Sequence, residues 1–320
     1  MIRTNHDSQM ARGDFFGQDR QGSEMVEGLD QLLAPYLRYP WLGYGGAAVV
    51  GLIAGSFLNV VTVRLPRLFD EAESVAGGGG GTIGARTVFN RLWGPRSCCP
   101  QCGRSLLWHE NLPLVSYVLL RGCCAGCGRA IGRRYPVVEL ACVLVSLSLI
   151  WALGFEVRTL SALVLGLTLV AISVIDIEHG VIIEAMVQPL IWGGLVLNAL
   201  EVFVPAGQAV LGAATGYLVL LIIYWAYLVL RRREGIGNGD FLVAAALGSW
   251  LGLGALPVVL GAAFVSGAVV GILQLISGHS GLKSALPFVP FLAFGGWVEL
   301  VSGDLVRSGY AELIGALIRI

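Results

Sequence analysis

The sequence has little charge. Only 13% of its 320 residues are charged, the 21 basic residues equal the 21 acidic residues in number, and 56% of the chain is hydrophobic. A mean hydropathy of +0.76 lies far outside the range of ordinary soluble domains. This composition predicts a polytopic membrane protein. Because the net charge is zero, the distribution of charge along the chain is more informative than its sum.

Two further features are missing. No apolar segment follows Met1, and residues 1–40 are mixed and polar, so we expect no cleavable signal peptide and insertion through the first true span. The arginines form no nucleic-acid-binding pattern, and those that flank apolar segments are explained by membrane topology. We therefore expect the lipid bilayer, and no nucleic acid, among the partners.

Apolar segments recur along the chain and predict an all-α membrane protein with about eight transmembrane helices. The predicted spans are 41–63, 137–154, 159–175, 183–203, 209–230, 241–253, 256–276 and 286–302. The corresponding domains are a polar arm (1–40), the first transmembrane helix (41–63), a zinc-binding loop domain (64–134), a membrane core (135–302) and an amphipathic tail (303–320).

Positive charge predicts the orientation of these spans. The loop 64–134 holds ten arginines, so the positive-inside rule places it in the cytoplasm. Following the chain through the spans leaves 14 of the 21 basic residues on the cytoplasmic side and Arg158 in a short external loop. The same topology puts Asp176 and Asp240 at the cytoplasmic face of the membrane.

Six of the seven cysteines lie between positions 98 and 127. They include two CxxC pairs, each followed by glycine: Cys99 with Cys102, and Cys124 with Cys127. Four thiolates with this spacing predict a zinc ribbon, and a site with four cysteine ligands has no open position, so the zinc is expected to be structural. Free or disulfide-paired cysteines are the alternative, and Cys98 or Cys123 could replace a neighbouring ligand.

Two aspartates stand where apolar segments meet polar loops. Asp176 ends one apolar run, and Asp240 begins another after a loop that contains Gly235, Gly237 and Gly239. A charge at membrane depth costs roughly 3 kcal/mol on insertion scales, so such residues usually have a partner or a function. Two aspartates at matching depth can share a proton and activate water, as in aspartyl proteases. A helix cap or an interfacial charge is the alternative. The three glycines would let the backbone approach an extended substrate.

The segment Gly235–Phe241 resembles the GxGD motif of the type IV prepilin peptidases, which are membrane aspartyl proteases. Other segments resemble this family in the family's own order, over roughly residues 51 to 300. They are Gly55–Pro66, Cys99–Arg104, Trp108–Tyr117, Leu120–Gly122, Cys124–Cys127, Arg134–Leu140, Leu247–Gly252 and Leu286–Leu292.

The resemblance implies a multi-pass endopeptidase of the bacterial inner membrane. It would cleave leader peptides from type IV prepilins or pseudopilins at the cytoplasmic face, with Asp176 and Asp240 as the catalytic pair and Zn²⁺ on the four paired cysteines. Many members also methylate the new N-terminus with S-adenosylmethionine, an activity associated with the first cytoplasmic loop. We associate Glu139 with this step; the alternative is an interfacial carboxylate paired with Arg133 or Arg134. The oligomeric state is left open.

Four residues at three sites depart from the family pattern. Ile183 and Glu184 stand where a Pro-Asp pair is usual, Leu242 where lysine is common, and Val289 where glycine is expected. These departures keep open a catalytically inactive scaffold of a pilus or secretion assembly. A proton-coupled transporter is a further alternative, although no repeated half of the sequence supports it.

Overall fold

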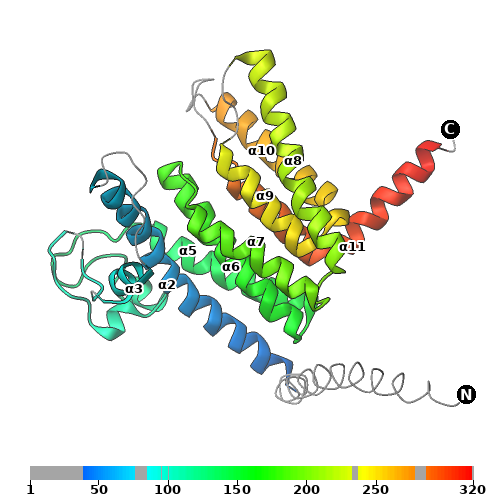
Figure 1. The fold of residues 1–320 in the computed structure, drawn as a ribbon. Helices are drawn as coiled ribbons and strands as arrows, with labels where there is room; N and C mark the ends of the chain where they lie inside the picture. The colour runs from blue at the N-terminus through cyan, green and yellow to red at the C-terminus, as the bar shows by residue number, and fades with distance from the viewer. Residues whose placement is uncertain are drawn as a thin grey trace, which may run out of the picture.

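The computed structural model describes residues 39–75, 85–94, 96–99, 101–232, 237–277 and 286–318. Most of these residues are helical, and their only β-type pairing is two isolated bridges (Figure 1). Most of the arm expected over 1–40, and Gly235 of the glycine-rich loop, lie outside the described residues. The all-α fold class is confirmed.

The helices follow one another with short connections. They are α2 (Pro40–Val75), α3 (Ala85–Trp93), η1 (Trp108–Asn111), α4 (Val115–Leu119), α5 (Arg134–Leu153), α6 (Val157–His179), α7 (Glu184–Ala199), α8 (Ala206–Arg231), α9 (Asn238–Leu251), η2 (Leu253–Ala255), α10 (Leu256–Ile276) and α11 (Val289–Ile318). Helix α2 continues through Pro66 to Val75, beyond the boundary expected at Val63. Helix α11 is kinked at Ser302.

Within the described residues, five helices are long and apolar enough to cross a membrane: Trp41–Glu71, Arg134–Leu153, Val157–His179, Ala206–Leu230 and Leu253–Ile276. A shorter apolar segment covers Val289–Gly303. With 16 and 14 residues, α7 and α9 are about 24 and 21 Å long, less than the roughly 30 Å of hydrocarbon in a bilayer. Each of the eight predicted segments is helical, but their number as transmembrane helices stays a prediction.

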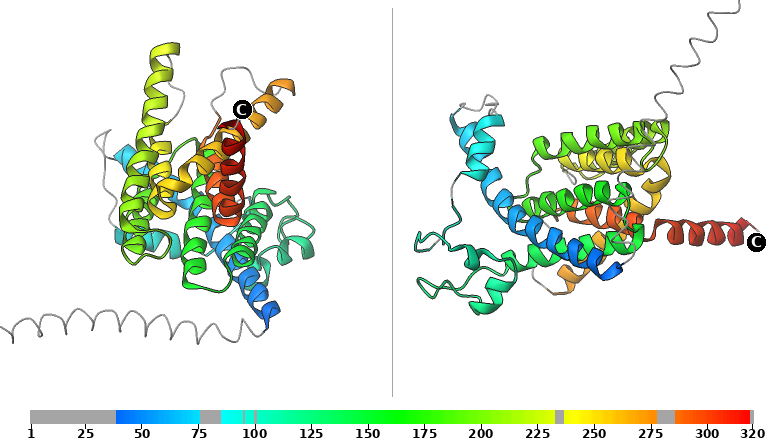
Figure 2. Two further views of the ribbon diagram at one scale, coloured as in Figure 1. Left: turned by 90° about the vertical axis from the view of Figure 1, so that its right-hand side faces the viewer. Right: turned by 90° about the horizontal axis from the view of Figure 1, so that it is seen from below.

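The long helices form one bundle. Helix α2 packs on α5, α6 contacts both α5 and α11, and α9 lies between α7 and α8. Figure 1 shows α2 and α8 on opposite sides of this bundle, with α6 and α7 between them. The cysteine loop (residues 96–133) lies at one end of the bundle, and the part of α11 beyond Ser302 projects from the opposite end. Figure 1 and the right-hand view of Figure 2 both show this arrangement.

Helices α7, α8 and α9 are held together by close packing and one buried amide. A Cβ on Gly212 of α8 would lie 2.3 Å from the carbonyl oxygen of Gly248 of α9, so the two backbones touch. At the end of α7, Asn198 Nδ2 donates to the carbonyl oxygens of Ser249 and Trp250 at 2.8 and 2.9 Å. The C-terminal end of α9 is therefore held by both α7 and α8.

Candidate active site and metal centre

The cysteine loop contains two turns of the same design. The amide of Cys99 donates to Arg104 O, and that of Gly103 to Cys99 O, both at 2.9 Å. The second turn repeats these bonds between Cys124 and Arg129 and between Gly128 and Cys124, both at 2.8 Å. Gly103 and Gly128 have φ of +69° and +67°, a conformation that side chains other than glycine rarely adopt. The glycine after each CxxC pair thus allows the chain to fold back over the thiols.

These turns bring together the four cysteines that the sequence singled out. The Sγ atoms of Cys99, Cys102, Cys124 and Cys127 lie within 4.8 Å of one another, with Cys99 and Cys127 at 3.9 Å. Zinc–sulfur bonds of about 2.3 Å in a tetrahedron separate sulfurs by about 3.8 Å, so the cluster fits Zn²⁺. Amides of Cys102 and Gln101 lower the pKa of the Cys99 thiol to about 6, which favours the thiolate form. Cys98 and Cys123 lie outside the cluster.

A buried carboxylate joins this centre to the rest of the loop. Glu110 Oε2 accepts the amide of Leu107 at 2.8 Å, and its Oε1 pairs with Arg104. The Leu107 amide and then Arg104 lower the pKa of Glu110, so its charge persists at neutral pH. The Arg104 side chain in turn packs against Gly126 of the second turn. Nothing in the sequence spacing pointed to this pair.

Asp176 lies in the last turn of α6 and is 7% exposed. Gly180 ends the helix in a left-handed conformation and donates its amide to Asp176 O at 2.9 Å. The carboxylate oxygen Oδ2 accepts the amide of Val289, the first residue of α11, at 3.2 Å. The helix end therefore holds Asp176 against a segment more than 100 residues away.

Asp240 stands in the first turn of α9 and is 5% exposed. Its Oδ2 accepts the amide of Gly237 at 2.9 Å, which fixes the side chain across the helix N-terminus. Its Oδ1 is buried and has no hydrogen-bond partner among the described residues. A buried carboxylate oxygen without a partner is unusual in a structural role, because each such atom costs free energy.

The connection between α6 and α7 packs against the first turn of α9, which holds Asp240. A Cβ on Gly239 would lie 2.6 Å from Ile182 in this connection, so only glycine allows the approach. The carboxylates of Asp176 and Asp240 are near enough to interact electrostatically. Whether Gly235, Gly237 and Gly239 receive a substrate stays a prediction.

A second polar cluster lies where α2, α5 and α6 meet. Arg134 pairs with Glu178 of α6 and donates to Thr62 of α2. Asn59, one turn before Thr62, donates to Tyr135 O at 3.1 Å. Sequence reasoning missed the Arg134–Glu178 pair. The available signal was that Asn59 and Thr62, three residues apart in an apolar helix, needed polar partners at this contact.

Glu139 of α5 is 9% exposed and does not use either arginine that the sequence offered as a partner. Its Oε2 accepts the amide of Leu114 in the cysteine loop at 2.8 Å, whereas Arg134 is paired with Glu178. Leu114 has φ +57° and ψ −44°, and the Val115 amide closes a γ-turn to Pro113 O at 2.6 Å. Glu139 thus holds a strained turn.

A pocket of about 440 Å³ opens beside this turn, between α2, α3 and the cysteine loop. We call it the α2–α3 pocket. Its lining includes Trp93, Arg64 and Arg96, and Asn111 and Pro113 from the strained loop. The Arg64 guanidinium also donates to Leu92 O of α3 at 2.8 Å. It therefore combines a flat aromatic surface with positive charge and hydrogen-bonding groups.

Two family models match the chain in succession. Residues 49–153 match the bacterial peptidase A24 N-terminal domain, and residues 163–272 match the type IV leader peptidase family. The first match contains the cysteine centre, Glu139 and the α2–α3 pocket, and the second contains Asp176 and Asp240. The division between the two matches therefore separates the two candidate sites.

Proteins similar over nearly their whole length carry the name prepilin leader peptidase/N-methyltransferase. One from Aeromonas salmonicida is 42% identical over 288 residues, covering 86% of this chain and 96% of its own. Relatives from Pseudomonas putida and Pseudomonas aeruginosa are 40% and 37% identical, covering 84% and 83% of this chain and 94% and 93% of their own. No solved structure matches the chain. On these grounds, the chain belongs to the type IV leader peptidase family.

Proposed function

We propose that this protein cleaves the leader peptide from type IV prepilins or pseudopilins and then methylates the new N-terminus. Membership of the family and the five long apolar helices indicate a multi-pass protein of the inner membrane. The observation that carries the peptidase assignment is the buried, unpartnered Oδ1 of Asp240 beside a second buried aspartate.

Asp176 and Asp240 act as the catalytic pair. Two buried carboxylates that interact electrostatically cannot both ionise readily, so in this proposal one carboxylate accepts a proton from water while the other donates one to the scissile carbonyl oxygen. Water adds to the carbonyl carbon, the carbon–nitrogen bond breaks, and the leaving nitrogen takes up a proton. The products are a leader with a new carboxylate and a mature chain with a new amine. The amides of Val289 and Gly237 hold the two carboxylates in place.

The site faces the cytoplasm in this proposal. The arginine-rich cysteine loop follows the end of α2. The predicted topology places the end of α6, which holds Asp176, and the start of α9, which holds Asp240, on the same side of the membrane as this loop. A basic leader would remain on that side while the hydrophobic helix after the cleavage site stays in the bilayer. Zn²⁺ on the four clustered cysteines would stabilise the loop without taking part in cleavage.

The α2–α3 pocket fits the methyl donor. S-adenosylmethionine, when bound, supplies a methyl group to the new N-terminal amine, which loses a proton. Trp93 offers a face on which an adenine ring can stack, and the exposed Arg96 can pair with the carboxylate of the methionyl part. Asn111 offers hydrogen bonds to the ribose. Glu139 positions this loop through the Leu114 amide.

The replacement Asp240→Asn tests the peptidase assignment. Asparagine keeps an oxygen to accept the Gly237 amide, so the helix start should be preserved while general acid–base catalysis is lost. We expect prepilin cleavage in detergent or vesicles to fall by about 10²- to 10⁴-fold. The matched control is Glu156→Gln, at the opposite end of α6, which should cleave normally.

Three results of this assay separate the alternatives. Cleavage by Asp240→Asn at the unmodified rate would refute the assignment of that residue. A wild-type protein that binds prepilin without cleaving it would be an inactive scaffold. Proton flux across vesicles without cleavage would point to a transporter.

A further inference from the structure

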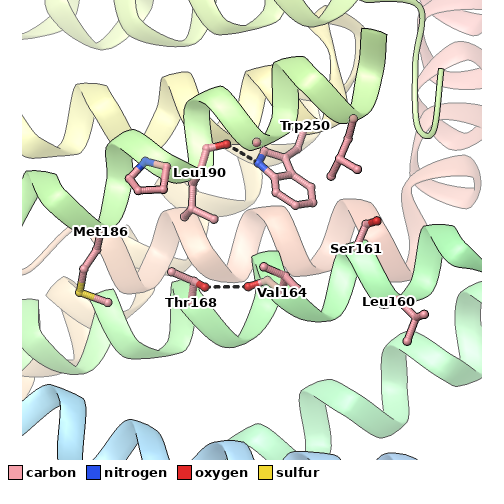
Figure 3. A pocket seen from close by; sticks show the side chains of 10 residues that line it. Leu160, Ser161, Val164, Thr168, Met186, Leu190 and Trp250 are labelled. Carbon is pink, nitrogen blue, oxygen red and sulfur yellow. Dashed lines mark hydrogen bonds between the residues drawn. The ribbon is translucent and has the colours of Figure 1, made fainter. Parts of the chain in front are cut away.

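Helices α6 and α7 follow each other in sequence but leave a groove of about 460 Å³ between them. We call it the α6–α7 groove. Figure 3 shows side chains of α6 below and of α7 above, with the indole of Trp250 from α9 facing the space between them. Leu160 and Val164 of α6 line it and are 51% and 58% exposed, so it opens on the surface that meets lipid.

The groove presents apolar surface even where its residues are polar. Ser161 Oγ donates to Val157 O at 3.2 Å, and Thr168 Oγ1 donates to Val164 O at 2.8 Å. The Trp250 Nε1–H donates to Leu190 O at 2.7 Å, as Figure 3 also shows. These side-chain donors are used within the protein. A polar occupant would leave its own groups unpaired, so the groove selects an apolar one.

One end of the groove lies next to the connection that packs against the start of α9. Met186, in the first turn of α7, lines the groove and donates its amide to Ile183 O at 2.9 Å. The preceding residue of that connection, Ile182, is the one packed against Gly239. From Met186 to Leu197 the α7 wall spans twelve residues, a rise of about 16 Å. This length matches about three turns of a helix.

The α7 wall also permits close approach by a backbone. A Cβ on Gly193 would meet only the Trp250 ring, at 3.8 Å, so the face of this glycine is not filled by a neighbour. In a bilayer, apolar burial gives helices little driving force, and they associate by packing against small residues. A glycine in an apolar groove therefore favours a helix over a loosely packed lipid chain.

We propose that the α6–α7 groove binds the hydrophobic helix that follows the cleavage site of the substrate. This inference rests on the proposed function. The first three turns of that helix lie along α7 from Met186 towards Leu197, which leaves the scissile bond at the end next to Asp176 and Asp240. The groove thus sets the register of cleavage, and it selects substrates whose mature N-terminus is apolar.

Photocrosslinking tests this placement. The photoreactive residue p-benzoylphenylalanine replaces Val164 in the groove or, as a matched control, Val210 of α8, which is similarly exposed at 56%. Both variants carry Asp240→Asn so that the substrate stays intact. In vesicles with full-length prepilin, we expect the helix of the prepilin to crosslink at position 164 at least five times more than at position 210, about the ratio that 1 kcal/mol produces.

The outcomes distinguish failure of the groove assignment from failure of the proposed peptidase function. Equal crosslinking at both positions, or crosslinking of position 164 to lipid alone, would overturn the groove assignment. Cleavage by the wild-type protein in the same vesicles would show that the proposed function survives that result. If the wild type does not cleave, the proposed function itself fails.

Filling the groove gives an independent measurement. Gly193→Leu should raise the KM for full-length prepilin by roughly tenfold, the effect of a misplaced apolar group in a binding pocket. A short peptide that ends soon after the cleavage site should be cleaved as before. The control is Gly46→Leu in α2, where a Cβ has no neighbour within 4 Å. An equal loss for both substrates would refute the role of the groove.

Discussion

At the scale of single residues, Glu139 shows how a membrane helix can control a loop outside it. The carboxylate belongs to a membrane helix, α5, but it accepts a hydrogen bond from the amide of Leu114, which lies in a loop turn and has a positive φ. A turn of this kind costs about 1–3 kcal/mol. The bond to Glu139 offsets part of that cost and places Asn111 and Pro113 at the edge of the α2–α3 pocket.

The variants Glu139→Ala and Glu139→Gln separate this positioning role from a general structural one. Alanine removes the acceptor for the Leu114 amide, and we expect methylation of cleaved pilin to fall about ten- to hundredfold, with cleavage nearly unchanged. Glutamine keeps an acceptor oxygen and should restore most of the methylation. Mass spectrometry of the processed N-terminus measures both. Parallel loss of cleavage and methylation in both variants would contradict the prediction.

The structure shows what two of the residues that depart from the family pattern contact. Val289, where glycine was expected, is fully buried and donates its amide to Asp176, a bond that any residue except proline could make. Leu242, where lysine is common, packs against the main hydrophobic cluster. The backbone contact to Asp176 is therefore independent of the substitution, whereas the positive charge near Asp240 is replaced by an apolar contact.

At the scale of elements, the two cysteine turns predict which thiols hold zinc. Cys99 points into the cluster, whereas its neighbour Cys98 is exposed and outside it. Purified wild-type protein should contain stoichiometric zinc by elemental analysis. Cys99→Ser should lose most of it because a tetrahedral site with three thiolates binds zinc far more weakly. Cys98→Ser is the matched control and should keep it. Equal loss in both would mean that Cys98 contributes a ligand.

The packing of α3 against α2 gives a second prediction at this scale. The Trp93 ring lies 5.1 Å from that of Phe57 and lines the α2–α3 pocket. Trp93→Ala should weaken binding of S-adenosylhomocysteine, measured by calorimetry, about tenfold or more, since stacking of a base contributes about 1–3 kcal/mol. Cleavage should continue. Trp151→Ala, on the exposed face of α5, is the control. Unchanged binding in Trp93→Ala would place the cofactor elsewhere.

The sequence predicted elements better than contacts. Cysteine spacing and the glycine after each pair were sufficient to pick out the four clustered cysteines, because a local turn brings both thiols of a pair together. Hydropathy located eight apolar segments that are helical, and the short span 241–253 already indicated that α9 would not cross a bilayer unaided. It did not show that α7, expected over 183–203, has only 16 residues. The approach of Ile182 to Gly239 and the pairing of Arg134 with Glu178 depend on how separate helices pack, which spacing along one chain does not encode.

At the scale of the whole molecule, the chain divides into a half that carries the cysteine centre and a half that carries the aspartates. Helices α2 and α5 contact α6, so the two halves share one bundle. The Arg134–Glu178 pair crosses this contact two residues from Asp176. A newly formed N-terminus would therefore move between two sites that are joined by packed helices.

Orientation in the membrane is the prediction that concerns the molecule as a whole. If the cysteine loop faces the cytoplasm, the exposed Cys98 acts as a native reporter. A membrane-impermeant maleimide should leave the wild-type protein unlabelled in intact spheroplasts and label it after lysis. The variant Glu156→Cys, in the turn between α5 and α6, should be labelled in intact spheroplasts, because a helix of 23 residues separates that turn from His179 at the other end of α6. Labelling of the wild type before lysis would reverse the topology and place both aspartates on the outer face, where a cytoplasmic methyl donor would not reach the cleaved substrate.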